Sequence, residues 1–158
     1  MNWAHLHLAL NHVPVMGTLF VTLLLLVGVL RASRDLVRAG LWAFVLLAAV
    51  SIPIKSTGDK AAQLAMSLDG INDTAMEQHE SAAGKATTGA FLAGVAAAAC
   101  LFMWRNSENV PRWAALFVLL LGAAAFGLMA WTANLGGQIR HPEITKPPES
   151  APVEKQQR

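Results

Sequence analysis

Residues 8–30 read LALNHVPVMGTLFVTLLLLVGVL, and this stretch decides the fold class. Its polar side chains are limited to Asn11, His12 and two threonines. A helix needs about 20 mainly apolar residues to cross the roughly 30 Å hydrocarbon core of a bilayer. We therefore expect this stretch to be a transmembrane helix.

Three further stretches have the same character, at residues 39–56, 82–104 and 113–135. Of the 158 residues, 54% are hydrophobic and 14% are charged, whereas soluble domains carry about 25% charged residues. The predicted fold is therefore all-α, an integral membrane four-helix bundle formed by residues 1–141. Residues 142–158 are rich in proline, glutamate, lysine and glutamine, and we expect them to form a flexible polar tail.

The basic residues predict how the bundle is oriented. The two short loops, 31–38 and 105–112, hold five arginines and two acids, whereas the longer loop, 55–81, holds two lysines and five acids. Lysine and arginine near span ends are retained on the cytoplasmic side of a membrane. We therefore expect short cytoplasmic loops, with the longer loop and both termini extracytoplasmic, in a bacterial inner membrane.

The longer loop is expected to contain helical structure of its own. Residues 59–68 carry a weak apolar stripe at helical spacing, which predicts a short surface helix that ends at Asp69-Gly70. Asn72 or Asp73 is a suitable N-cap for a further helix. That helix would run through His79 directly into the third span.

The five histidines fall on one predicted membrane face: His5, His7, His12, His79 and His141. His12 lies about one turn inside the first span, His79 just precedes the third span and His141 follows the fourth. An ionisable side chain within a span is costly to keep and marks a candidate functional site. The alternative for each is structural, either a hydrogen-bonded imidazole or a solvated one.

Imidazole is the usual axial ligand of b-type haem, and bundles hold cofactors between facing helices. The leading hypothesis is a haem b protein in electron transfer, with His12 and His79 as axial ligands on the inner side of the bundle. Their ligating nitrogens would then lie roughly 4 Å apart across the iron. His141 or His7 is the alternative ligand, or the ligand of a second haem, and Arg140 could pair with a haem propionate.

Two other hypotheses stay open. A transition metal ion such as zinc, copper or iron could bind a set drawn from three histidines and three glutamates, namely His12, His79, His141, Glu77, Glu80 and Glu143. The chain could instead be a cofactor-free accessory subunit that docks a periplasmic partner. With a haem, the expected partners are subunits of a redox complex or a periplasmic electron carrier. The net charge of +2 gives no support to nucleic acid binding.

Residues 10–15, LNHVPV, resemble the opening of small four-helix bacterial membrane proteins of the domain-of-unknown-function-2231 type. The first helix of those proteins begins with a His-x-Pro-Ile/Val element. His79 at the start of the third helix and Gly136-Gly137 after the fourth fit the same pattern, so the resemblance covers about residues 5–143. The chain departs from it in Asn11-His12 and in the preceding His5-x-His7. The resemblance implies a haem or metal site and leaves its reaction open.

Overall fold

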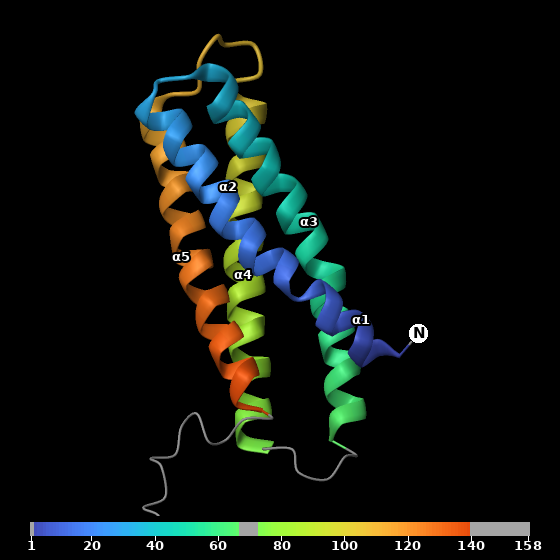
Figure 1. Cartoon of the computed structure of the whole chain (residues 1–158). Coiled ribbons are helices and arrows are strands. Elements are labelled where there is room, and N and C mark those ends of the chain that lie inside the picture. The colour runs from blue at the N-terminus through green and yellow to red at the C-terminus, as the bar shows by residue number, and fades with distance from the viewer. Residues whose placement is uncertain (1, 67–72, 140–158) are drawn as a thin grey trace, which may run out of the picture.

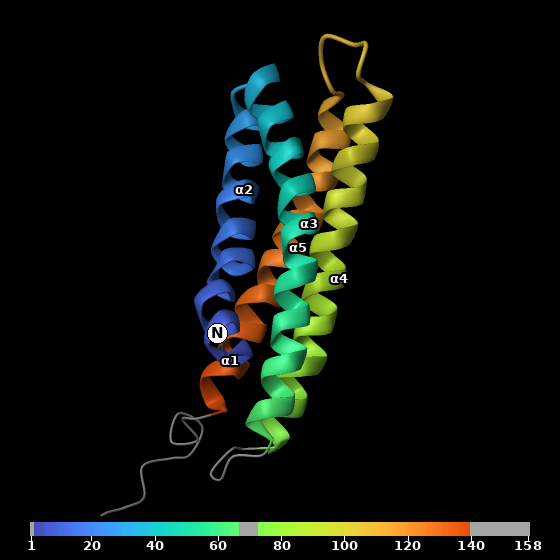
Figure 2. The same cartoon turned by 90° about the vertical axis from the view of Figure 1, so that its right-hand side faces the viewer.

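The computed structural model describes residues 2–66 and 73–139, and over these residues the protein is all-helical, without strands. The helices are α1 (Trp3–Leu10), α2 (His12–Leu30), α3 (Arg34–Ala65), α4 (Asp73–Met103) and α5 (Arg112–Gln138). The four long helices run side by side, and they follow the order α2, α3, α4, α5 around the bundle (Figures 1 and 2). The short α1 packs against α3 at one end. The expected all-α class is confirmed.

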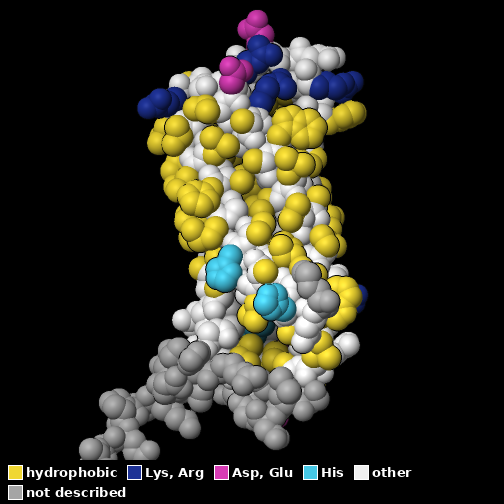
Figure 3. Space-filling view, turned by 45° about the vertical axis from the view of Figure 1, so that its right-hand side comes forward, with side chains coloured by type: hydrophobic (Ala, Val, Ile, Leu, Met, Phe, Trp, Pro, Cys, Tyr) yellow, Lys and Arg dark blue, Asp and Glu magenta, His cyan; other side chains and the backbone are white. Residues whose placement is uncertain are grey.

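Four helical segments are long and apolar enough to cross a membrane, when α1 and α2 are taken as one segment, Trp3–Leu30. Hydrophobic side chains cover the shaft of the molecule, and basic side chains gather at one end (Figure 3). Large apolar side chains such as Leu120 (69% exposed) lie on the outer surface. In water such a surface would favour aggregation, whereas in a bilayer it contacts lipid.

The first span is broken at its start. Asn11 separates α1 from α2, and the cause lies three residues later, because Pro14 has no N–H to donate to the carbonyl of Leu10. Restarting the helix at His12 places Pro14 in the first turn of α2, where no intrahelical N–H bond is needed. Asn11 itself keeps helical backbone angles, and α1 packs against α3.

The second span is longer than expected. We predicted a span over 39–56 and a separate surface helix over 59–68, but α3 continues without interruption to Ala65, so the separate helix is wrong for residues 59–65. Lys55 and Asp59 form an ion pair of 2.8 Å one turn apart, which supports the helix at the predicted break. With 32 residues, α3 is about 48 Å long and exceeds the hydrocarbon thickness.

The third span begins early, as expected. The structure places Asp73 in the first turn of α4, which passes through His79 and reaches Met103 as one helix. His79 therefore lies on a rigid extension, two turns from the start of α4. The fourth span is α5, which ends at Gln138, three residues beyond the predicted end at 135.

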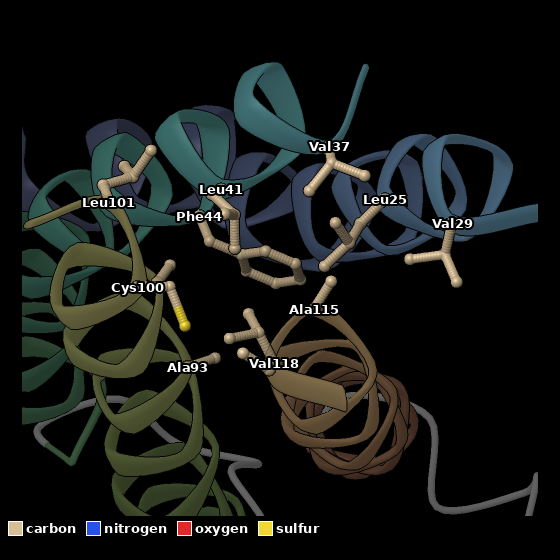
Figure 4. Packing of buried hydrophobic residues seen from close by; sticks show 12 residues of the cluster. Leu25, Val29, Val37, Leu41, Phe44, Ala93, Cys100, Leu101, Ala115 and Val118 are labelled. Carbon is tan, nitrogen blue, oxygen red and sulfur yellow. The ribbon is translucent and has the colours of Figure 1, made fainter. Parts of the chain in front are cut away.

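The core lies in the half of the bundle near the α2–α3 and α4–α5 connections. Phe44, Leu25, Leu41 and Val118 are almost fully buried there (Figure 4). Glycine allows the helices to approach closely: a Cβ added at Gly94 would lie 2.3 Å from the Cβ of Ala48. Helices in membranes associate through such small residues, because lipid offers no hydrophobic driving force between them.

Candidate histidine site

The four described histidines lie at the end of the bundle away from the arginines. His5 and His7 are on α1, His12 begins α2 and His79 is in the second turn of α4. Imidazoles are visible near that end in Figure 3. The other predicted site residues at the C-terminal end, namely Arg140, His141 and Glu143, lie outside the described residues.

His79 points from α4 toward α5. Its Nδ1 lies 2.9 Å from the backbone carbonyl oxygen of Thr132. A carbonyl can only accept a hydrogen bond, so Nδ1 carries a proton and donates it. Gly136, one turn further along α5, faces the ring: a Cβ there would lie 3.1 Å from Cε1 of His79. The half-buried imidazole thus packs directly against the backbone of α5.

His7 is held in a similar way, from α1 against α3. Its Nδ1 lies 3.2 Å from Oγ1 of Thr57, and that hydroxyl donates its own proton to the carbonyl of Ile54, at 2.6 Å. With its proton on the Ile54 carbonyl, Oγ1 accepts from a protonated Nδ1 of His7. Gly58 faces this ring, since a Cβ there would lie 2.8 Å from Cε1 of His7.

These contacts leave the same nitrogen available on both rings. In a neutral imidazole whose Nδ1 is protonated, Nε2 keeps its lone pair. The side-chain contacts of both rings described above are made through Nδ1, and the His7 imidazole also interacts with the backbone of Ile54. The two rings are held by different neighbouring helices, His7 by α3 and His79 by α5. Proteins commonly orient a histidine that binds a metal through Nε2 by a hydrogen bond from its Nδ1 to a neighbouring protein group.

His12 does not take part in this arrangement. Its side chain is exposed on α2, whereas we expected it on the inner side of the bundle, facing His79. His5 is exposed as well. The half-buried pair at this end is His7 and His79.

The acidic residues do not complete a metal site with these histidines. Glu77 is exposed and Glu80 is half-buried, both on α4. Within residues 2–66 and 73–139, no three side chains of His, Cys, Asp or Glu come together in a way that could hold a metal ion.

Comparison with protein-family models, with curated proteins and with solved structures gives no match.

Sequence reasoning missed the partners that hold these rings. Thr57, Gly58 and Thr132 were not singled out, although each lies at the level of a histidine on the neighbouring helix. A threonine followed by a small residue within a turn, at the histidine end of a span, is the signal that could have indicated them. Gly136 was noted only as part of a glycine pair.

Asn11, at the break between α1 and α2, is a further polar feature of this end. Its backbone N–H donates to the carbonyl of His7, at 2.8 Å. Its side-chain oxygen is buried and finds no hydrogen-bond partner among the described residues. An unpaired buried acceptor costs roughly 1–3 kcal/mol. The side-chain oxygen of Asn11 therefore remains able to accept a hydrogen bond at this end of the bundle.

Proposed function

We propose that the chain is a b-type haem protein of a bacterial inner membrane that takes part in electron transfer, in which Nε2 of His7 and Nε2 of His79 would hold the haem iron. One observation carries this proposal. Two half-buried imidazoles, delivered by α1 and α4, are each held through Nδ1 and each leave Nε2 for a metal.

The number of ligands favours haem over a bare metal ion. A zinc or copper site takes three or four protein ligands, whereas the porphyrin supplies four nitrogens to haem iron and the protein adds one or two. Two imidazoles, those of His7 and His79, would be enough protein ligands for haem iron. Bound haem would supply one-electron chemistry, and the protein would set its potential through the ligands and their surroundings.

The contacts behind each ring would serve this role. The Thr132 carbonyl and the Thr57 hydroxyl keep Nδ1 protonated and hold the ring plane, so that Nε2 keeps one direction. Gly58 and Gly136 let each imidazole sit against a helix backbone, where a larger residue would push it away. Both rings would thus be oriented before a cofactor arrives.

The position of the site suits exchange with a partner. Lys60 lies 3.8 Å from the ring centroid of Trp3, and Lys85 lies 5.7 Å from that of Trp131. Tryptophan and lysine of this kind mark the membrane interface. A haem at this level would be close enough to the surface to exchange electrons with a redox subunit or a periplasmic electron carrier.

The arginine bias supports an orientation with the histidine end outside the cytoplasm. A reporter that is active only outside the cytoplasm should be active when fused after Arg158 and inactive when inserted near Arg34. A reporter that is active only in the cytoplasm should give the opposite pattern. If the fusion after Arg158 is cytoplasmic, the proposed exchange with a periplasmic carrier is wrong.

The haem proposal is tested by the absorption spectrum of the full-length protein, purified from cells supplied with a haem precursor. We expect a Soret band, and α and β bands on reduction, with about one haem per chain for one pair of axial ligands. Metal analysis of the same sample separates the alternatives. Bound zinc, copper or iron without haem would replace the proposal by a non-haem metal site. A protein that binds neither, even after incubation with haem, would favour the cofactor-free accessory subunit.

A further inference from the structure

The end of the bundle opposite the histidines carries a strong positive charge. The α2–α3 connection and the first turn of α3 hold Arg31, Arg34 and Arg38, and the α4–α5 connection brings Arg105 and Arg112. Basic side chains gather at this end in Figure 3. All of these arginines except the half-buried Arg38 are exposed.

The charge of these arginines is not neutralised within the described chain. Asp35 and Glu108 belong to the same connections, yet neither forms an ion pair with an arginine there. The ion pair that the described residues do form joins Lys55 and Asp59, near the other end. The arginine end is therefore open to an anion from outside the chain.

Arg38 joins the two connections. Its Nη2 donates to the carbonyl of Trp104 and to the carbonyl of Ser107, each at 2.8 Å. This links α3 to the loop that follows α4. The exposed arginines of both connections therefore lie on one surface. Arg38 holds the two connections together and is not itself proposed to contact an anion.

Apolar side chains flank the arginines on the outer surface. The guanidinium of Arg105 lies 4.5 Å from the ring centroid of Phe102 and donates to its carbonyl, at 3.1 Å. Phe102 and Trp113 are 68% and 67% exposed. A guanidinium bound in this way keeps free N–H groups for an anion directly above an apolar surface.

We propose that this end binds the phosphate group of an anionic phospholipid, with the acyl chains lying against the apolar surface that includes Phe102 and Trp113. A phospholipid carries an anionic phosphate joined to hydrocarbon, which matches guanidinium groups above exposed aromatic rings. An acidic peptide would match the charge, but it has no hydrocarbon chain to lie against Phe102 and Trp113. The inference shares membrane insertion with the proposed function and does not depend on the histidine site.

Native mass spectrometry of the full-length protein in detergent tests the proposal. The protein is titrated with dioleoyl phosphatidylglycerol or with dioleoyl phosphatidylcholine, which differ in headgroup charge and share their acyl chains. We expect the anionic lipid to bind at least about fivefold more tightly, and each exposed arginine to contribute about fivefold. Equal binding of the two lipids by the unaltered protein would overturn the proposal.

Two matched variants locate the site. The triple change Arg34→Gln, Arg105→Gln and Arg112→Gln should greatly reduce the preference for the anionic lipid, leaving at most the contribution of the exposed Arg31. The triple change Lys55→Gln, Lys60→Gln and Lys85→Gln removes the same charge from the other end and should keep it. A loss of preference in both variants would show a general charge effect and contradict the proposal.

Two competition arms identify the source of the anion. Millimolar inorganic phosphate should not displace the lipid, because it lacks acyl chains, and neither should a short acidic peptide. Displacement by either would assign the arginines to a soluble anion or to a protein partner, and the lipid proposal would be wrong. A sample without haem that still prefers the anionic lipid would contradict only the proposed function.

Discussion

Replacing His79 by alanine is expected to abolish haem binding while the protein still accumulates in the membrane. The change removes one of two axial ligands. Since the loss of an outer-shell partner alone costs about 10- to 100-fold in metal affinity, the loss of a ligand should cost more than about 100-fold. Membrane insertion depends on hydrophobicity, which the change increases. The measurement is the Soret absorbance per mole of purified protein, and His7→Ala should give the same loss.

His12→Ala is the matched control for these variants. It removes the same group from the same end of the bundle, but the imidazole of His12 is exposed on α2. We expect the haem content of His12→Ala to equal that of the unaltered protein. A loss of haem in His12→Ala together with full retention in His7→Ala would instead support His12 as the ligand and refute the site built from His7 and His79.

A second large effect is expected from Gly94→Ala. The new Cβ would lie 2.3 Å from the Cβ of Ala48 and 3.2 Å from the carbonyl oxygen of Phe44. Both atoms are fixed to the backbone of α3, so α3 and α4 would have to move apart. Overpacking of this kind costs about 1–3 kcal/mol. Reversible unfolding of the purified protein in mixed micelles should show that loss of free energy of unfolding.

Gly127→Ala is the control for this change. Gly127 lies in α5, and an added Cβ would meet no atom within 4 Å. Because alanine favours a helix over glycine by up to about 1 kcal/mol, stability should stay the same or rise. Equal losses in Gly94→Ala and Gly127→Ala would mean that close contact of α3 with α4 does not explain the effect.

The sequence by itself determined the helical class, the four membrane-length segments and the end at which the described histidines lie. Each of these is a local property. In lipid a spanning segment must satisfy its own backbone hydrogen bonds, so apolar length alone predicts a helix. Short connections make successive spans antiparallel, which brings the starts of the first and third spans to the same end. The early start of α4 agrees with the acidic Asp73 in its first turn and with the polar residues that come after it.

Only the tertiary structure decided which histidine faces inward. A soluble helix shows its buried side by an apolar stripe, but α2 is apolar almost all round and offers no such stripe. The inward position predicted for His12 rested only on how far along the span it lies. In the structure its side chain is exposed. The break at Asn11 and the continuation of α3 beyond Ser56 bring His7 against Thr57. These contacts join residues 50 positions apart, so they depend on how the helices pack and not on any local pattern of the chain.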